Sequence, residues 1–183
     1  VQDLSLTPNT LTGQVTDSFT GLPISGVSVT VIDSSNVVYA VSTDGTGHYA
    51  VSNLPAGATT VAASKSGYSS ANGSLTIVTG ANIQDEVLTP NILSGVVRDT
   101  STLLPITGAT VVVVDNANVT TTITTGPDGS YAVTTIASGA ATVTASKSGY
   151  TSASANPLIV TGANVQDHNL TPTTLMGVVT DSL

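Results

Sequence analysis

Aspartates are the side chains in this sequence that could bind a metal ion or cap a turn, and most of them recur at a fixed interval along the chain. The recurring sets are Asp17, Asp99 and Asp181; Asp3, Asp85 and Asp167; and Asp33 and Asp115. Calcium takes six to eight oxygen ligands, so acidic residues near a junction between repeats could hold it, with Asp85, Glu86 and Asp99 as the first place to look. An Asp that follows a strand also bonds the backbone of a turn. Because no run has the closely spaced aspartates of a dedicated calcium loop, we favour the turn role.

The two histidines, His48 and His168, could take part in a Ser–His–Asp arrangement, but neither recurs. Their counterparts one repeat away are Ser130 and Glu86. Such an arrangement also needs one serine marked as a nucleophile, and none of the many serines is marked. We therefore predict that both histidines are solvated surface residues. The chain is expected not to be an enzyme, with no catalytic, cofactor-binding or metal-binding residue.

Three asparagines begin the Asn-x-Ser/Thr triplet that N-glycosylation requires. They are Asn72, Asn118 and Asn169, and none of the triplets is kept from one repeat to the next. A chain rich in serine and threonine contains such triplets by chance. Glycans on threonine hydroxyls are therefore an equal alternative to glycans on asparagine.

The composition excludes several classes of protein. The 183 residues carry a net charge of −8 with three basic residues, and only 8% of them are charged. Binding of nucleic acid or of an anionic lipid surface needs a basic patch, so neither is expected. The chain has no cysteine, which excludes disulfides and thiolate chemistry. An uncharged, hydroxyl-rich surface favours an extracellular or cell-surface protein, and no apolar run is long enough to cross a bilayer.

An internal repeat organises the whole chain, with a period of about 82 residues. Residues 11–17 return as residues 93–99 and begin again at residue 175, with no gap in the alignment. We therefore predict four pieces: residues 1–10 as the last strand of a preceding repeat, 11–92 and 93–174 as two β-sandwich repeats, and 175–183 as the first strand of a third. Since both ends fall inside a repeat, the simplest interpretation is a window from a longer polypeptide.

Apolar and polar residues alternate at period two, which predicts strands, and no stretch has a sustained helical period. Turn residues separate these runs about every ten residues, the spacing typical of a sandwich. Strands are expected near 11–16, 26–33, 37–42, 48–53, 58–64, 73–79 and 82–88, and at the equivalent positions of the second repeat. The predicted fold is all-β, with tandem seven-stranded Greek-key β-sandwich repeats. Pro90, with its fixed φ, should stiffen the junction between them.

Five motifs follow one another in order through the first repeat. They are Gly-Gln-Val-Thr-Asp at 13–17, Pro-Ile-Ser-Gly-Val-Ser-Val at 23–29, Thr-Asp to Gly-His-Tyr at 43–49, Leu-Pro-Ala-Gly at 54–57 and Lys-Ser-Gly-Tyr at 65–68. Together they resemble the carboxypeptidase regulatory-like domain, a transthyretin-like, Ig-like seven-stranded sandwich. The second repeat departs at 136–139, where the proline is lost and the turn glycine stays. The resemblance implies a non-catalytic module, often found in bacterial or archaeal surface and extracellular repeat proteins, and it implies no ligand.

Lys65 and Lys147, in the Lys-Ser-Gly-Tyr turns, could in principle form Lys–Asn isopeptide bonds as pilin-type sandwiches do. Those domains are similar in fold but place the lysine on the first strand, and residues 13–17 contain none. We therefore predict no cross-link, with the lysine stem lying along the aromatic ring of its turn. Each bond would lower the intact mass by about 17 Da, because the reaction releases ammonia.

Architecture recurs in this sequence, whereas the reactive side chains do not. The first hypothesis is therefore a structural repeat module of an extracellular filament, fibre or cell-surface stalk. Its partners would be the continuation of the same chain or further copies that self-associate by strand addition at exposed sheet edges. The alternatives are a surface adhesin or carbohydrate-binding module, and spacer domains attached to a secreted enzyme. A carbohydrate site needs aromatic platforms, and the chain has no Trp, one Phe (Phe19) and a tyrosine, Tyr39, whose counterpart is Thr121.

Overall fold

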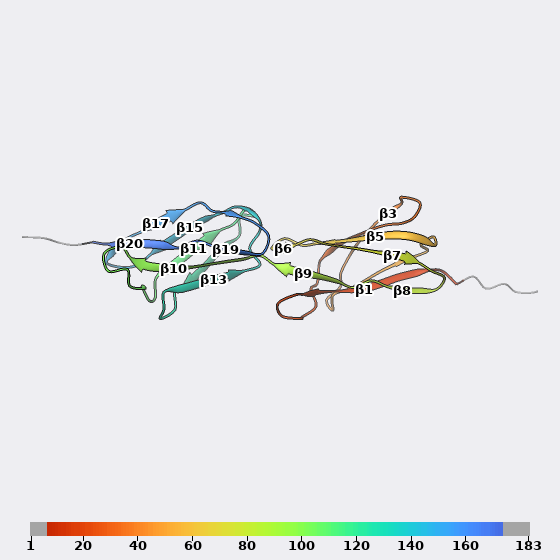
Figure 1. The fold of residues 1–183 in the computed structure, drawn as a ribbon, viewed down its shortest axis with the longest axis horizontal. Coiled ribbons are helices and arrows are strands. Elements are labelled where there is room, and N and C mark those ends of the chain that lie inside the picture. The colour runs from red at the N-terminus through yellow and green to blue at the C-terminus, as the bar shows by residue number, and fades with distance from the viewer. Residues whose placement is uncertain (1–6, 174–183) are drawn as a thin grey trace, which may run out of the picture. The chain divides into compact units, whose positions relative to one another are not determined.

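The computed structural model describes residues 7–173, which form two units, each with its own hydrophobic core. The first unit ends at Pro90 and the second begins at Asn91. The secondary structure of the described residues is all-β, as the alternation at period two predicts (Figure 1). Within residues 7–173, no helix is long and apolar enough to cross a membrane.

Two facing sheets make up the first unit. One sheet has the order β4-β1-β9-β6, with β8 also paired to β1, and the other has the order β3-β2-β5-β7. Strands β8 and β9 run parallel to β1, whereas the other pairs are antiparallel. Because β1 and β2 lie in different sheets, as do β3 and β4, the chain crosses repeatedly between the two layers. The strands are β1 (Thr10–Asp17), β2 (Ser28–Ile32), β3 (Val38–Ser42), β4 (His48–Ser52), β5 (Gly57–Ser64), β6 (Tyr68–Ser69), β7 (Ala71–Ile77), β8 (Ala81–Ile83) and β9 (Glu86–Pro90).

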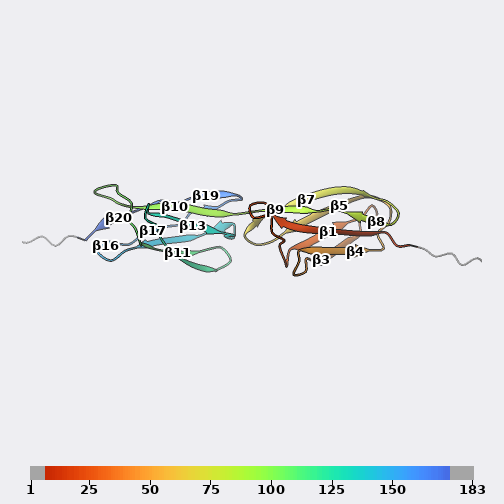
Figure 2. The ribbon, with the colours of Figure 1, turned by 90° about the horizontal axis from the view of Figure 1, so that it is seen from below.

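The second unit repeats this plan. Its two larger sheets have the orders β13-β10-β20-β16, with β19 also paired to β10, and β12-β11-β15-β17, and β14 and β18 form a separate antiparallel pair. Figure 2 shows β10 and β19 in one layer of this unit and β11 in the other. The strands are β10 (Ile92–Asp99), β11 (Thr110–Val114), β12 (Thr120–Thr124), β13 (Ser130–Thr134), β14 (Gly139–Ala140), β15 (Thr142–Ser146), β16 (Tyr150–Thr151), β17 (Ala153–Ala155), β18 (Leu158–Ile159), β19 (Ala163–Val165) and β20 (His168–Pro172).

The core of each unit lies between its two sheets and consists mainly of aliphatic side chains. Val27, Val29 and Val31 are fully buried, as their alternation with polar residues predicts. One buried tyrosine per unit, Tyr49 or Tyr131, adds the largest ring. Burying one Val or Leu side chain contributes about 1.5–3 kcal/mol, so a core of this kind can hold a unit of this size without disulfides.

The structure has more strands per repeat than the seven we predicted. The strand predicted over 82–88 is divided into β8 and β9, and the short strand β6 is added. At the division, the backbone carbonyl of Gln84 turns to accept a hydrogen bond from Oη of Tyr49, at 2.6 Å. Oδ1 of Asp85 then accepts the backbone N–H of Gln14 at 2.8 Å. A carboxylate thus replaces one backbone acceptor of the ladder, which splits the strand.

A second difference concerns the edge strand of the four-stranded sheet. In the first unit this edge is the continuous strand β7, whereas in the second it is divided into β17 and β18. Pro157 stands where the first unit has Leu75. Proline has no N–H to donate to the ladder, so the edge strand is interrupted there.

Candidate functional site

Asp17 caps the loop that follows the first strand of its unit. Its Oδ1 accepts the backbone N–H groups of Phe19 and Thr20 at 2.7 and 2.9 Å. Asp99 holds the equivalent loop of the second unit in the same way, at 2.7 and 3.0 Å. Burial alone would raise the pKa of Asp17, but the N–H groups of Thr20 and Phe19 hold it below its ordinary value. These carboxylates have the turn role that the sequence favours.

Asp33 closes the turn between β2 and β3. Its Oδ1 accepts two backbone N–H groups of that turn at 2.8 and 2.9 Å, and its Oδ2 accepts Oη of Tyr39 at 3.1 Å. Asp115 binds its own turn identically through Oδ1, while its Oδ2 accepts the N–H of Ala137. Tyr39 is half-buried and its hydroxyl is engaged, so it does not stand free as a platform for a sugar ring.

The acidic residues considered as calcium ligands at the junction belong to different units. Asp85 and Glu86 lie in the first unit and Asp99 in the second. Among residues 7–173, no group of three or more His, Asp or Glu side chains is gathered where a metal ion could be held. Two further recurring aspartates, Asp3 and Asp181, lie outside the described residues. The absence of a metal site at the junction stays a prediction, with calcium as the less favoured alternative.

One ionisable side chain is buried at the same position of each sandwich. It is Glu86 in the first unit and His168 in the second, at 6% and 4% exposure. Oε1 of Glu86 accepts Nε2 of Gln84 at 3.3 Å, and Gly73 leaves room for it, since a Cβ there would lie 2.2 Å from Oε1. Nε2 of His168 is buried without a hydrogen-bond partner. The prediction that His168 is a solvated surface residue is wrong, because its strand turns this position inward; His48 is exposed, as predicted.

Two asparagines per unit hold backbone groups at one end of the sandwich, and nothing in their sequence context singled them out. Oδ1 of Asn82 accepts the N–H of Val78 at 2.9 Å. Its Nδ2 donates to the carbonyls of Thr10, Val78 and Gly80 at 3.1, 3.0 and 3.1 Å. Asn164 makes the same four hydrogen bonds in the second unit. Their recurrence from one repeat to the next is the one signal that could have found them.

A second asparagine pair, Asn9 and Asn91, completes this arrangement. Nδ2 of Asn9 donates to the carbonyl of Leu54 at 2.9 Å, and its Oδ1 accepts the N–H of Gly80 at 3.1 Å. Asn91 is fully buried and bonds the equivalent groups of the second unit. These amides therefore satisfy backbone groups that the strand ladders leave unpaired.

The lysines of the Lys-Ser-Gly-Tyr turns are also bound to the backbone. Nζ of Lys65 donates to the carbonyl of Ser25 at 2.6 Å, and Nζ of Lys147 donates to the carbonyl of Gly108 at 2.8 Å. Each lysine thus ties its turn to the loop that precedes the second strand of its unit. Because these partners are main-chain carbonyls, the geometry offers no support for a Lys–Asn bond, and the absence of a cross-link stays a prediction.

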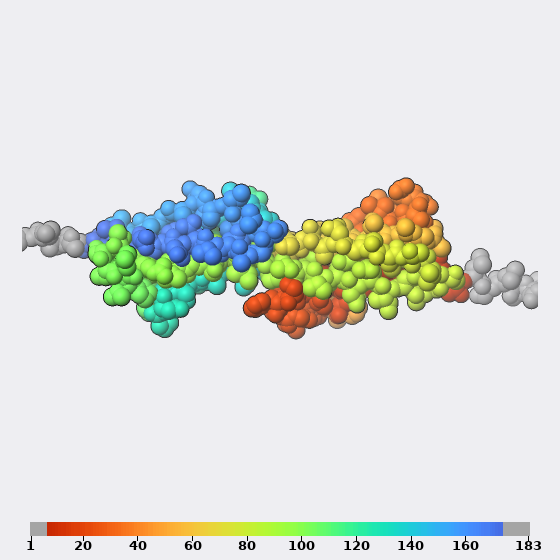
Figure 3. Space-filling model, in the orientation of Figure 1, coloured from red at the N-terminus to blue at the C-terminus, as the bar shows by residue number. Residues whose placement is uncertain are grey.

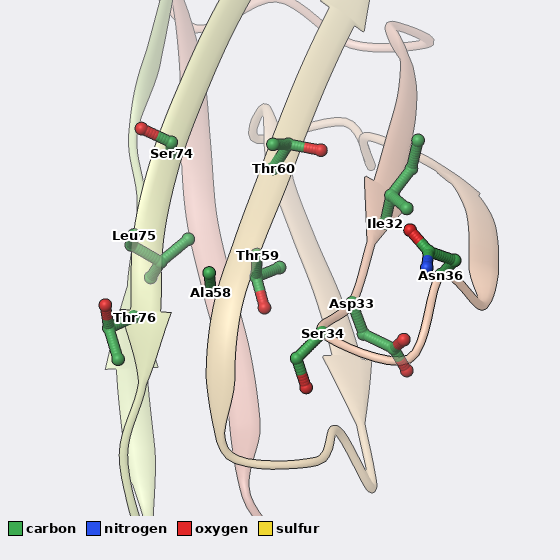
Figure 4. A pocket seen from close by; sticks show the side chains of 10 residues that line it. All are labelled: Ile32, Asp33, Ser34, Asn36, Ala58, Thr59, Thr60, Ser74, Leu75 and Thr76. Atoms are coloured by element: carbon green, nitrogen blue, oxygen red, sulfur yellow. The ribbon is translucent and has the colours of Figure 1, made fainter.

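An open hollow recurs on the outer face of the four-stranded sheet. In the first unit its volume is about 670 Å³, and Figure 4 shows it between the turn after β2, strand β5 and strand β7. The equivalent residues of the second unit line a hollow of about 300 Å³. Small side chains such as Ala58 and Thr60 line it, together with Asp33, whose carboxylate is engaged in its own turn. The hollow is shallow and hydroxyl-lined, and its lining has no aromatic side chain.

The sequence model of the carboxypeptidase regulatory-like domain matches residues 10–88 and again residues 92–173. The chain belongs to the carboxypeptidase regulatory-like domain family. Its two copies follow one another in tandem, as the resemblance of the five motifs predicts. Comparison with curated proteins found no match for the chain.

Several solved structures are similar to this pair of carboxypeptidase regulatory-like domains. The Bacillus anthracis TIE protein is 14% identical in sequence, with a TM-score of 0.46. The match covers 91% of this chain and 34% of the TIE chain. Shaft pilin SpaA from Lactobacillus rhamnosus GG is 14% identical with a TM-score of 0.45, covering 94% of this chain and all 100% of its own. GBS52, the minor pilin of Streptococcus agalactiae, is 14% identical with a TM-score of 0.42, covering 94% of this chain and 100% of its own. Likenesses at this level support no statement about function.

The exposed asparagines of the two domains are accessible as glycan acceptors. Asn72 lies on β7 and Asn169 on β20, and both are exposed. Asn118 is exposed at the turn between β11 and β12, with a left-handed φ of 59°. Glycosylation at these residues, or on threonines, stays a prediction.

The buried ionisable position should give the two carboxypeptidase regulatory-like domains opposite responses to pH. Burial lowers the pKa of His168, with the charge of Asp167 opposing it. Burial raises the pKa of Glu86, opposed by the hydrogen bond from Gln84 and reinforced by the charge of Asp85. Both folded domains therefore favour the neutral side chain. As the pH falls below 6.5, unfolded chains protonate the histidine first and the second domain loses stability, whereas the first gains stability as Glu86 takes up its proton.

Urea unfolding between about pH 5 and 8 measures this difference. Comparing the wild-type chain with His168→Gln isolates the histidine from every other titrating group, and Glu86→Gln does the same for the glutamate. Subtracting the free energy of unfolding of His168→Gln from that of the wild type should give a difference that falls as the pH is lowered. The corresponding difference between the wild type and Glu86→Gln should rise. Two differences with slopes of the same sign would contradict the burial assigned to these side chains.

Proposed function

We propose that the chain is a structural repeat module of an extracellular filament, fibre or cell-surface stalk, and that it is not an enzyme. In this proposal residues 11–92 and 93–174 are the repeats, while 1–10 and 175–183 belong to neighbouring ones. Self-association or continuation of the same chain joins the repeats into a fibre. The described residues include no membrane-spanning helix, and the proposed location is the cell surface or the extracellular space.

The proposal rests on one observation: the recurring polar side chains bind backbone groups of their own unit. Asp17, Asp33 and Asp85 each bind backbone N–H groups, and their partners in the second unit do the same. Asn82 and Asn164 bind four backbone groups each. The recurring aspartates and asparagines therefore hold turns and strand junctions in place. Every copy in an array of stacked modules needs this stabilisation.

The two positions that carry a histidine change between copies instead. The buried position of Glu86 becomes His168, and exposed His48 becomes Ser130. A catalytic or metal site duplicated with the repeat would keep its residues together in both copies. Structural continuity is the property that both copies share.

Electron microscopy of the native material tests the proposal. A filament should show a regular axial repeat of at least about 23 Å, the length of a seven-residue strand. Isolated particles without any axial periodicity would overturn it.

The recurring hollow favours one alternative, a surface adhesin or carbohydrate-binding module. Its hydroxyl-lined wall could hydrogen-bond a neutral sugar, although no aromatic side chain of the lining offers a stacking surface. A glycan array probed with the intact chain and with Thr60→Lys, which places a cation in the hollow, would identify such binding. Specific binding that the substitution removes would favour this alternative over the structural proposal.

A further inference from the structure

The outer strand of the β2–β3 hairpin is an open sheet edge, and so is its counterpart in the second unit. Among the described residues, β3 pairs with β2 alone and β12 pairs with β11 alone. The hairpin, orange in Figure 3, stands out from the body of the first unit. Each unit therefore presents a row of backbone groups along one side of its four-stranded sheet.

The hydrogen bonds at the two ends of the hairpin show which backbone groups are free. The N–H of Asp33 donates to the carbonyl of Val37, and the N–H of Thr43 donates to the carbonyl of Val27. Since facing direction alternates along an antiparallel strand, the odd-numbered residues of β3 face β2. The N–H and C=O groups of residues 38, 40 and 42 face away from the sheet. The equivalent hydrogen bonds of the second unit place Thr120, Thr122 and Thr124 in the same position.

This edge has none of the features by which natural proteins protect a free strand. Charged side chains, proline and bulges serve that purpose. Strand β3 reads Val-Tyr-Ala-Val-Ser and β12 reads Thr-Thr-Thr-Ile-Thr, and both pair with their neighbours in unbroken register. The side chains of Val38, Ala40 and Ser42 are all exposed.

Three other edges of the same sandwiches are closed in part. At the start of β4, the N–H of His48 donates to Oδ1 of Asp44 at 3.0 Å, and the carbonyl of His48 accepts the N–H of Asp44 at 2.9 Å. The start of β13 is blocked in the same way by Asp128 and Gly126. The far edge of the second unit is interrupted at Pro157. The hairpin edge is thus open in both units, whereas the far edge of the same sheet is a continuous strand, β7, in the first unit alone.

We infer that this hairpin edge binds the same edge of a second copy of the chain, by antiparallel pairing about a two-fold axis. With Ala40 opposite Ala40, Val38 of each copy lies opposite Ser42 of the other. Every outward N–H and C=O of these three residues then finds a partner, because the pairs that face each other are hydrogen-bonded pairs. Self-pairing of one surface is the isologous contact of a two-fold dimer. The inference rests on the proposed function in one respect: between filaments, such contacts would join neighbours side by side.

The lack of charge along the hairpin edge makes it a place where a second copy of this acidic chain can approach. The chain carries a net charge of −8, so two copies repel each other, yet the two hairpin strands contain no charged residue. The nearest carboxylates flank the strand, Asp33 before it and Asp44 after it. Antiparallel pairing brings the Asp33 end of one copy beside the Asp44 end of the other. Salt should therefore strengthen the association by screening this repulsion.

Sedimentation equilibrium of the 183-residue chain tests the inference. One strand edge buries little surface, so we expect weak reversible association that tightens as NaCl rises from about 0.05 to 0.5 M. The double variant Ala40→Pro, Thr122→Pro removes two outward N–H groups that no fold contact uses, and proline is tolerated at such edge positions. It should weaken the association about tenfold or more, which corresponds to about 1.4 kcal/mol.

A pair of lysine variants keeps the test decisive if proline disturbs the fold. Ala40→Lys, Thr122→Lys places a charge on the edge, and Thr60→Lys, Thr142→Lys places the same charge on exposed positions of the central strands β5 and β15. The edge pair should weaken association while the central pair leaves it unchanged. A wild-type chain that stays monomeric at every salt concentration, or edge variants that associate like the wild type, would overturn the inference.

The same variants separate this inference from the proposed function. If native filaments show their axial repeat while the wild-type chain does not associate in solution, the filament proposal stands and lateral pairing fails. If the chain associates through its edge but native material shows no axial repeat, lateral pairing stands and the filament proposal fails.

Discussion

Replacing Gly95 by alanine should unfold the second unit at a much lower temperature than the first. A Cβ at Gly95 would lie 1.9 Å from the backbone oxygen of Gln166 and 2.9 Å from Cε1 of Tyr131. Gln166 cannot move aside easily, because Oη of Tyr131 donates to that same oxygen and the N–H of Gln166 donates to the carbonyl of Ser94. We expect a loss of at least about 3 kcal/mol in the free energy of unfolding, the range of severe packing defects.

Differential scanning calorimetry measures this effect. For a domain of this size, 1 kcal/mol shifts the midpoint by roughly 4–8 °C, so the second unit should melt on the order of 12 °C lower or more. Gly45→Ala is the matched control, since a Cβ at Gly45 meets nothing within 4 Å. It should leave both midpoints nearly unchanged. Gly13→Ala should transfer the defect to the first unit, where the added Cβ would lie 1.8 Å from the oxygen of Gln84. Equal melting of Gly95→Ala and Gly45→Ala would show that the two strands do not approach so closely.

The second large effect is expected from Asn82→Asp, which keeps the shape of the side chain and removes its donor. Nδ2 of Asn82 donates to the carbonyls of Thr10, Val78 and Gly80, and the residue is 7% exposed. A carboxylate oxygen in that place would face three carbonyl oxygens with no proton between them. The carbonyl of Gly80 keeps a second partner, the N–H of Thr10, whereas the donor from residue 82 is lost to all three carbonyls. Losing hydrogen bonds at a part-buried site costs about 1–3 kcal/mol, so we expect the first unit to lose a free energy of unfolding in that range.

The pH dependence of this variant distinguishes a lost donor from a general disturbance. The surrounding carbonyls and the burial disfavour the ionised form, so the introduced carboxyl group should have a raised pKa in the folded chain. Its destabilising effect is then present at neutral pH and shrinks as the pH falls through that pKa, because the protonated acid can donate again. Urea unfolding of the variant and of Asn72→Asp, an exposed position on β7, provides the comparison. A destabilisation of Asn82→Asp that is independent of pH would contradict the donor role.

Features set by near neighbours in the chain could be predicted from the sequence. Asp17 and Asp33 are turn residues because each carboxylate binds N–H groups two to four residues further on. The burial of Val27, Val29 and Val31 follows from the alternation of side chains along a strand. The all-β class, the tandem arrangement and the family all follow from such local patterns, which return in the second repeat.

Features that depend on contacts across the sandwich could not be predicted in this way. The division of the strand predicted over 82–88 depends on Gly13, near the other end of the same repeat, and on the hydroxyl of Tyr49. Of the four hydrogen bonds of Asn82, the one to the carbonyl of Thr10 spans 72 residues, so the sequence around Asn82 does not reveal it. His168 has the polarity of a surface residue, and only the packing of the two sheets decides that it is buried.

The sequence by itself thus determined the period, the strands and the turns, because hydrogen bonds within turns and the alternation of strand faces are local. The tertiary structure alone decided where a strand passes close to a glycine of another strand, which polar side chains are buried and which sheet edges are left open. Those properties arise when segments far apart in the chain meet, and the open edge beside Ala40 is visible only once every other strand has found its partner.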